Sequence, residues 1–210
     1  MKKLILTAAI AVFGFTGAMA QEFSFGPKAG VNFATLTGDI ENNDMKIGFH
    51  VGGAAEFKFN EKMGVQAELL YSAQGTKYEE SESFGGVTAK YEEKLKLDYV
   101  NIPFSFKYYI VNGFNVSAGP QVGILVSAKS DWEETITGGG FDQSDSGEVD
   151  IKDSLKSIDF AFNLGLGYKM DNGLNFDARY SLGLMDISDF DNSNGEIKNG
   201  VIQLSVGFMF

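Results

Sequence analysis

His50 is the only histidine in the sequence, and histidine is the side chain that most readily moves a proton near neutral pH. A hydrolase of the Ser–His–acid type would need a serine and a carboxylate beside it, and no motif around His50 supplies them. The sequence has no cysteine, which excludes a thiolate nucleophile, a thiolate metal site and a disulfide framework. It contains no phosphate-binding loop, dinucleotide fingerprint or zinc motif. We therefore expect no enzyme activity, cofactor or resident metal, and we interpret His50 as an interior filler held by hydrogen bonds.

Carboxylates are the other chemically capable groups, and they are unevenly distributed. There are 28 Asp and Glu against 17 Lys and Arg, a net charge of −11, which disfavours nucleic acid as a partner. Twenty of the 28 lie in four stretches that hold six basic residues, namely 36–45, 75–94, 130–156 and 185–198. A rim of this kind is able to bind divalent cations or a basic partner, although a solvated surface is the simpler interpretation. The run 189–196 resembles a calcium loop but misses the EF-hand spacing.

Hydrophobicity that repeats every two residues indicates the elements that must position these side chains. Eight segments alternate apolar and polar residues, which is the pattern of strands with one apolar and one polar face. They span residues 23–33, 47–59, 63–74, 95–110, 114–127, 158–169, 174–183 and 202–210. The fourth segment changes phase, and we predict a β-bulge near Tyr99–Val100 that restores the pattern.

Short and long connections alternate between these segments. Residues 60–62, 111–113 and 171–173 are typical of tight turns, and the four acidic stretches form the longer connections. This rhythm is typical of an outer-membrane barrel. We predict an all-β fold, an eight-stranded antiparallel up-and-down transmembrane β-barrel. A soluble sandwich is the alternative, but glycine recurs on the polar faces, and aromatic residues gather near the strand ends of the apolar faces.

An eight-stranded barrel leaves an interior that side chains fill, so charges that point inward must be paired. The alternation places nine charged side chains on the inward face. They are Lys28, Glu56, Lys58, Glu68, Lys107, Asp159, Lys169, Asp177 and Arg179. Five of them are basic and four are acidic, and we predict a plug-like polar network among them. For the residues near the rims, an ordinary solvated lumen stays open as the alternative.

The first twenty residues have the features of a secretory signal peptide. Two lysines precede an apolar stretch, and the stretch ends in a small-x-small cleavage signal. A membrane-anchoring helix is the alternative, but the stretch is short and ends in small residues. We predict a signal peptide over residues 1–20, cleavage between Ala20 and Gln21, and a barrel domain over residues 21–210.

Three stretches resemble the PorT family of outer-membrane β-barrel domains. They read FGPKAGVNFATLTGD in the first strand, DYVNIPFSFKYY in the fourth and GPQVGILVSAK in the fifth. The positions that match the family patterns are Gly26, Lys28, Gly30, Asn32, Tyr99, Ile102, Pro103, Lys107, Tyr108, Gly119 and Pro120. Ala34 replaces the usual small polar residue. The terminal Phe210 resembles the C-terminal signal that the barrel-insertion machinery reads. The resemblance implies an outer-membrane barrel, and the founding member of the family is associated with type IX secretion.

These observations lead to one functional expectation. We expect a monomer in the outer membrane of a Gram-negative cell, in contact with outer-membrane lipid and with the barrel-insertion machinery. Its acidic loops would face outside and serve a structural or surface-interaction role without enzyme activity. Three alternatives stay open: a narrow pore or small-ligand carrier, an accessory factor of type IX secretion, and a lipid-modifying enzyme that depends on His50.

Overall fold

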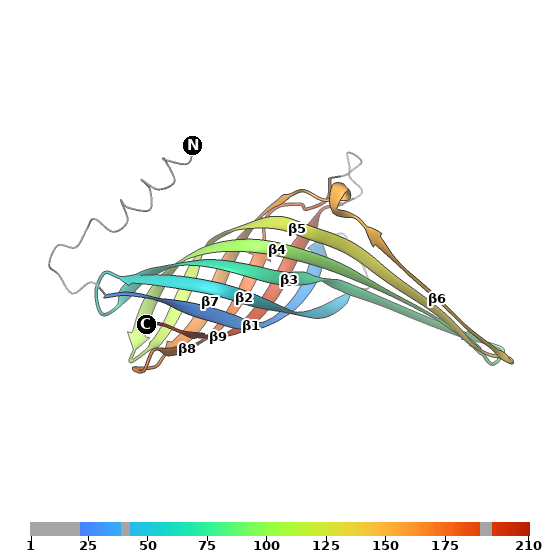
Figure 1. Ribbon diagram of the computed structural model, residues 1–210, viewed down its shortest axis with the longest axis horizontal. Coiled ribbons are helices and arrows are strands. Elements are labelled where there is room, and N and C mark those ends of the chain that lie inside the picture. The colour runs from blue at the N-terminus through green and yellow to red at the C-terminus, as the bar shows by residue number, and fades with distance from the viewer. Residues whose placement is uncertain (1–21, 39–42, 190–194) are drawn as a thin grey trace.

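The computed structural model of the chain describes residues 22–38, 43–189 and 195–210. These residues form nine β-strands and one short 3-10 helix (Figure 1). The elements are β1 (Glu22–Gly38), β2 (Asp44–Lys58), β3 (Met63–Phe84), β4 (Val87–Val111), β5 (Phe114–Gly138), β6 (Phe141–Asp150), η1 (Lys152–Ser154), β7 (Ile158–Lys169), β8 (Leu174–Gly183) and β9 (Ile197–Phe208). Within the described residues, no helix is long and apolar enough to cross a membrane. The predicted signal peptide, with its cleavage site between Ala20 and Gln21, lies outside them.

Eight of the described strands close into an antiparallel ring. Their order around the ring is β1, β2, β3, β4, β5, β7, β8 and β9, and β9 pairs again with β1. Lys28 of β1, for example, is paired with Gly52 of β2 on one side and Gly207 of β9 on the other. Closure satisfies the backbone of every ring strand, as a sheet that faces lipid requires. The predicted eight-stranded antiparallel barrel is therefore confirmed.

The short connections lie together at one end of the ring. They join β2 to β3, β4 to β5 and β7 to β8, where the sequence predicts tight turns. Gly113 and Gly173 adopt positive φ angles of 80° and 90° in two of them, a conformation that suits glycine. Strand β1 begins and strand β9 ends at this same end. In outer-membrane barrels the short turns face the periplasm, so the opposite end faces outside.

Four strands form a sheet that projects beyond the outer end of the ring, and we call it the arm (Figure 1). It consists of residues 77–94, from β3 and β4, and residues 129–150, from β5 and β6. Strand β5 changes partner along its length: residues 114–124 pair with β7, and residues 129–138 pair with β6. Strands β3 and β4 continue without a break from the ring to the tip, where Phe84 pairs with Val87.

The arm corrects the prediction of long loops over residues 75–94 and 130–156. Both faces of the arm meet water, so the apolar alternation that marks a strand in lipid is missing there. The two groups of glycines that close the arm carry the remaining signal. Gly85 and Gly86 have φ angles of 63° and 81°, and Gly138–Gly140 have angles between 64° and 108°, so each group turns one strand into the next.

The predicted bulge near Tyr99 is present, but the extra residue lies in the neighbouring strand. Asp98 pairs with Ser127 and Tyr99 pairs with Leu125, which leaves Val126 of β5 without an opposite residue. Strand β4 keeps its odd-numbered side chains inside from Leu97 to Tyr109. The apparent change of phase in the sequence has another cause. The inward side chains of β4 are apolar near the outer end, where Leu97 and Tyr99 are buried, and mostly polar towards the periplasmic end.

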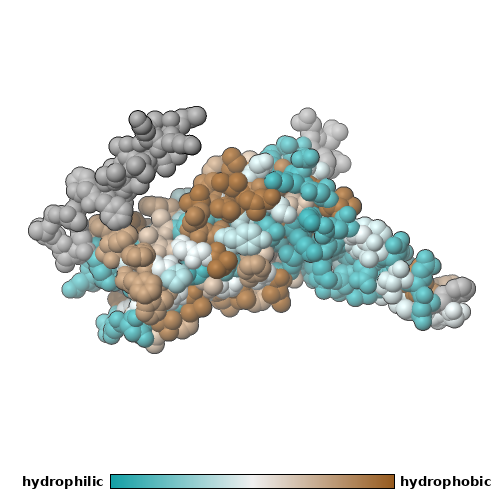
Figure 2. Space-filling model, in the orientation of Figure 1, coloured by the Kyte–Doolittle hydropathy of each residue, from teal (hydrophilic) through white to brown (hydrophobic). Residues whose placement is uncertain are grey.

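The ring exposes its apolar side chains and buries its polar ones. Ile47 and Leu69 are 70% and 60% exposed, whereas Asn32 and Glu56 inside the ring are 0% exposed. The space-filling view shows hydrophobic side chains over the ring and hydrophilic ones over the arm (Figure 2). This distribution is the reverse of a soluble domain and suits a wall surrounded by lipid. The alternative of a soluble sandwich is wrong.

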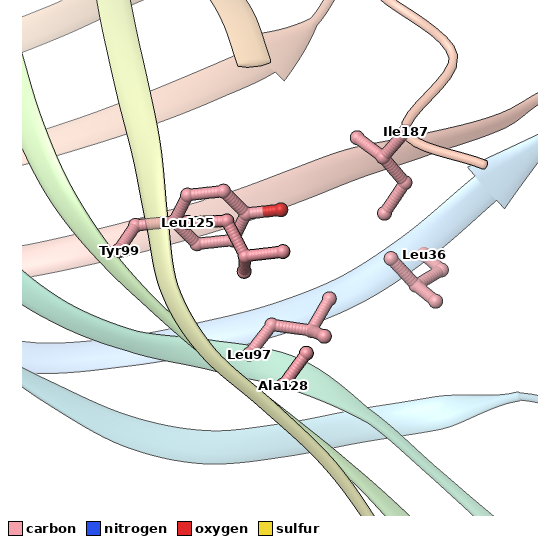
Figure 3. Close-up of a cluster of buried hydrophobic side chains, with 6 residues drawn as sticks. All are labelled: Leu36, Leu97, Tyr99, Leu125, Ala128 and Ile187. Carbon is pink, nitrogen blue, oxygen red and sulfur yellow. The ribbon is translucent and has the colours of Figure 1, made fainter. Parts of the chain in front are cut away.

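An apolar cap fills the ring next to the arm. It consists of Leu36, Leu97, Tyr99, Leu125, Ala128 and Ile187 (Figure 3). The connection between β8 and β9 supplies Ile187, and Asp186 anchors that connection by accepting the backbone N–H of Ile197 at 2.9 Å and of Ser188 at 3.2 Å. The N–H of Ile197 holds the pKa of the Asp186 carboxyl below its usual value, so the carboxylate keeps its charge near neutral pH. The cap packs inside the ring at the outer end of the interior.

Candidate functional site

The interior of the ring is built around the Glu68 carboxylate of β3. It accepts hydrogen bonds from Lys28 Nζ at 3.1 Å and from both terminal nitrogens of Arg179 at 3.2 Å each. The three side chains come from β3, β1 and β8, and each is at most 6% exposed. A carboxylate held by a guanidinium fork and an ammonium group makes strong, charge-assisted hydrogen bonds. Glu68 therefore ties together strands that lie apart in the ring.

A second carboxylate, Glu56, extends this arrangement towards the periplasm. Lys107 Nζ lies 3.5 Å from Glu56 Oε2, and the Tyr109 hydroxyl donates to Glu56 Oε1. Lys107 also donates to Gln66 Oε1 at 2.8 Å, and Gln66 in turn donates to Glu68 at 2.5 Å. The amide of Gln66 thus joins the two carboxylate centres.

Six charged side chains form one connected group, which we call the interior network. It consists of Lys28, Glu56, Glu68, Lys107, Asp177 and Arg179. Three positive and three negative charges balance. The enclosed space left between these side chains is about 10 Å³, which is about the minimum that a single water molecule needs. These six side chains therefore pack closely at this level of the ring.

The other three charges predicted to join this network lie elsewhere. Lys58 and Lys169 are at the periplasmic mouth, where Glu22 Oε2 lies 3.4 Å from Lys58 Nζ and Glu22 Oε1 lies 3.7 Å from Lys169 Nζ. Asp159 is near the outer end and accepts a hydrogen bond from Asn199 at 2.8 Å. The nine charges therefore do not form one network of ion pairs. Six are joined in the interior network, Lys58 is linked to it through Tyr109, and Asp159 lies beside the apolar cap, where Asn199 donates to both Asp159 and Tyr99.

Sequence reasoning missed three residues of this interior. Tyr109 is two residues from Lys107 in the same strand, so the alternation of the strand places both side chains on the inward face. Gln66 is likewise two residues from Glu68 and points inward with it, but an uncharged amide gives no signal in the sequence that it links two carboxylates. Glu22 precedes the first predicted segment, and its place at the mouth follows only from the closure of the ring.

The periplasmic mouth is a cavity of about 910 Å³. Glu22, Lys58, Tyr109 and Lys169 line it together with the short turns. Lys58 Nζ lies 4.5 Å above the centre of the Tyr109 ring, a distance suited to a cation–π contact. The cavity lies on the periplasmic side of the interior network, since Tyr109 in its lining donates to Glu56, and we call it the vestibule.

His50 lies inside the ring and is only 1% exposed. Its Nε2 is 2.8 Å from the Ser205 hydroxyl, and its Nδ1 is 2.8 Å from Asn32 Oδ1. This is the connectivity of a Ser–His–Asn catalytic triad, and no sequence motif points to Ser205 as the serine. Asn32 is itself fixed, since its amide nitrogen donates to the carbonyl oxygen of Ala73 at 2.8 Å. Both partners hold the ring in place between packed strands.

Gly30 explains how His50 and Ser205 meet. In the ladder, His50 of β2 and Ser205 of β9 are both paired with Gly30 of β1, one on each side. The missing side chain at Gly30 lets the two polar groups reach each other across β1. A Cβ atom built on Gly30 would lie 2.6 Å from His50 Cε1, so the imidazole occupies the space that a side chain at Gly30 would need. The arrangement is suited to close packing of the inner wall.

Large and small residues alternate across the inner wall around β1. Lys28 lies between Gly52 and Gly207, and Asn32 lies between Gly48 and Gln203. A narrow barrel needs such alternation because inward side chains from adjacent strands compete for the same space. The glycines of the first-strand motif thus have a packing role.

The arm carries most of the net charge. It contains twelve acidic and four basic residues, a net charge of −8 out of the −11 of the chain. Some of these charges are paired: Lys96 contacts Asp131, and its hydrogen bond holds the pKa of the Asp131 carboxyl below the usual value. Hydrogen bonds from Lys94 and Lys90 likewise lower the pKa of Glu92. The arm therefore stays strongly negative at neutral pH.

Phe210 lies on the outer wall at the periplasmic end. Its backbone N–H donates to the carbonyl oxygen of Phe25 at 2.9 Å, and its ring centre lies 5.0 Å from that of Phe208 and 6.2 Å from that of Phe25. The ring is 70% exposed. The last residue of the chain thus extends the aromatic surface at this rim.

A match to a family model agrees with this architecture. Residues 19–189 match the family model described as outer membrane protein beta-barrel domain. Similar solved structures include Ail, the attachment invasion locus protein of Yersinia pestis (17% identity, 90% of this chain and 99% of that chain, TM-score 0.45). They also include Neisserial surface protein A, with 13% identity over 91% of this chain and 100% of that chain and a TM-score of 0.40. OprG from Pseudomonas aeruginosa has 14% identity over 92% of this chain and 98% of that chain and a TM-score of 0.34. No curated protein matches the sequence.

Proposed function

The chain belongs to the family of outer membrane protein beta-barrel domains, and from this membership we propose that it is a sealed barrel that holds an acidic arm outside the cell. Its location is the outer membrane. The proposed role is structural: the ring anchors, and the arm meets other molecules. Catalysis has no part in it, and a basic molecule or divalent cations are the partners that the charge of the arm would attract.

The filled centre of the ring is the observation that carries this proposal. Three positive and three negative side chains fill the centre, about 10 Å³ of space remains between them, and an apolar cap lies above. Buried charges with this many partners are expensive to separate, which supports a permanent plug over a gate. The vestibule of about 910 Å³ is the feature that favours a small-ligand carrier, but it lies on the periplasmic side of the interior network.

Recordings in planar lipid bilayers test the proposal. We expect the purified protein to insert without steady single-channel steps, because ions meet the interior network before they can cross. Electrophoresis of the same sample with and without boiling confirms that the barrel is folded, since a closed barrel migrates differently when unheated. Reproducible conductance steps from a folded sample would contradict the sealed barrel and favour the narrow pore.

We further propose that, within this family, the chain is related to PorT-type barrels. The eleven matching motif positions support this relation, and the alternation of Lys28, Gly30 and Asn32 with small and large neighbours gives the first motif a physical reason. A link to type IX secretion does not follow from a barrel motif. We expect cargo secretion to continue in a strain that lacks this protein, and its loss would support the accessory role instead.

A further inference from the structure

The two faces of the arm differ in charge. Side chains alternate between the faces along each strand, and directly paired residues share a face. All four lysines of the arm lie on one face, which we call the paired face. Their ion pairs there join Lys77 to Glu79, Lys90 and Lys94 to Glu92, and Lys129 to Glu148.

The opposite face, which we call the aromatic face, has carboxylates and rings but none of these lysines. It carries Tyr78, Glu80, Glu82, Tyr91, Glu93, Trp132, Glu134 and Asp145. The register places Tyr78, Glu93 and Trp132 in one row, and Glu80, Tyr91, Glu134 and Asp145 in the next. None of the five carboxylates lies in an ion pair with another residue that the structure describes. This face therefore has negative charge that the chain itself does not neutralise.

The rings and carboxylates are interleaved in a way that suits organic cations. A lysine ammonium or an arginine guanidinium is attracted both to a carboxylate and to the face of an aromatic ring. Tyr78 and Tyr91 stand edge to face with ring centres 6.4 Å apart, and the Tyr78 hydroxyl donates to Glu80 at 2.8 Å. A single metal ion would need converging ligands, and in the described part of the chain no three His, Cys, Asp or Glu side chains converge in that way.

The edge of β6 offers a second means of binding. Within the described residues, β6 pairs with β5 alone, so its other edge has no partner strand, although the backbone N–H of Ser146 donates to Asp145 Oδ1 at 2.9 Å. The strand carries Asp142, Asp145, Glu148 and Asp150 and no basic residue. Gly147 lies at this edge under the indole of Trp132, whose atoms come within 2.9 Å of a Cβ built on the glycine. A strand added to this edge would bring its side chains beside that indole.

We propose that the aromatic face and the adjoining edge of β6 bind an extended polypeptide segment rich in lysine or arginine. The backbone of the segment pairs with β6, and alternate cationic side chains lie over Trp132 and against Glu134 and Asp145. This proposal rests on the proposed function, since it names the partner class of the displayed arm. Strand addition of this kind is a general mode of peptide recognition.

A labelled peptide tests it with the full chain folded in zwitterionic detergent. The probe is a fluorescein-labelled peptide of about eight residues that alternates lysine with threonine, and its control alternates glutamate with threonine. Anisotropy measures binding, and the emission of Trp132, the single tryptophan, reports contact at the site. We expect saturable binding of the lysine peptide with a shift in Trp132 emission. Binding without that shift would overturn the proposed location.

Two charge-matched variants separate the site from general attraction. Glu134→Gln with Asp145→Asn removes two of the five negative charges of the aromatic face, and Glu133→Gln with Asp142→Asn removes two negative charges from the paired face of the same strands. We expect the first to weaken binding about tenfold and the second by less than about threefold. Equal losses would mean that the net charge alone attracts the peptide, and would overturn the proposal.

Two further measurements complete the experiment. Trp132→Leu leaves the charge unchanged and should still weaken binding severalfold. Calcium chloride alone, at a concentration that does not raise the ionic strength appreciably, should leave Trp132 emission unchanged; a saturable shift that excludes the peptide would identify a metal site and overturn the proposal. Bilayer recordings on the same sample keep the sealed barrel separately testable, because they involve no peptide.

Discussion

Replacing Glu68 by alanine is expected to lower the free energy of unfolding by about 3–5 kcal/mol. The change leaves Arg179 without its paired carboxylate and leaves Lys28 with Asp177 as its only anionic partner. All of these groups are at most 14% exposed, so water cannot replace the lost contacts. The measurement is urea unfolding in detergent, followed by the change in electrophoretic mobility between the folded and unfolded forms.

Glu22→Ala is the matched control, since it also removes one carboxylate that touches two cations. Glu22 is 61% exposed at the mouth, with Lys58 at 3.4 Å and Lys169 at 3.7 Å. Exposed ion pairs contribute little, and we expect a loss of about 1 kcal/mol or less. Similar losses for the two variants would contradict the view that burial makes the Glu68 contacts decisive.

Removing Arg179 together with Glu68 sharpens this test. The remaining interior charges are Lys28 and Lys107 against Glu56 and Asp177, so balance is restored. The double variant should therefore be more stable than the sum of the single losses implies, by about 2 kcal/mol. Strictly additive losses would show that the two side chains are not coupled through their contact.

Gly30→Val is expected to cost about 3 kcal/mol or more and to reduce the yield of folded barrel sharply. A Cβ atom at this position would lie 2.0 Å from the backbone oxygen of Leu204 and 2.6 Å from His50 Cε1. The imidazole would have to leave its place between Asn32 and Ser205. The fraction of protein with the mobility of a folded barrel, measured after refolding in detergent, gives the readout.

Gly53→Val is the control for that substitution. Gly53 lies in β2, paired with Pro27 of β1, and a Cβ atom built on it would have its nearest neighbour, the oxygen of Gly26, at 3.7 Å. We expect its stability to stay within about 0.5 kcal/mol of the parent protein. If both variants folded equally well, the crossing of His50 and Ser205 over Gly30 would not be the constraint that the structure indicates.

The ring could be predicted from the sequence because lipid and a packed interior impose opposite chemistry on successive residues. Segments such as 174–183 alternate strictly, and their ends coincide with β8 (Leu174–Gly183). The tight turns could be predicted as well, since Gly113 and Gly173 are needed for their positive φ angles. In these parts, each residue type is decided by its immediate surroundings.

The arm could not be predicted in the same way. Residues such as Glu79 and Glu80 point to opposite faces, yet both faces are hydrated and accept the same polar side chains, so no period appears. The interior presents a different difficulty. The alternation of apolar and polar residues places His50 and Ser205 inside. Their contact, however, requires that β2 and β9 lie on either side of β1 and that both residues are paired with Gly30. That register is a property of the closed ring and not of any single segment.

The continuity of β3, β4 and β5 from the ring into the arm has a mechanical consequence. Backbone hydrogen bonds in an antiparallel sheet run perpendicular to the strands. A partner that pulled on the tip of the arm along its length would load the bonds between these strands in shear, many at once, instead of opening them one by one. The same strands continue into the wall that lipid surrounds, so the force would pass to the membrane without crossing a hinge. The arm is thus built as a tether as much as a binding surface.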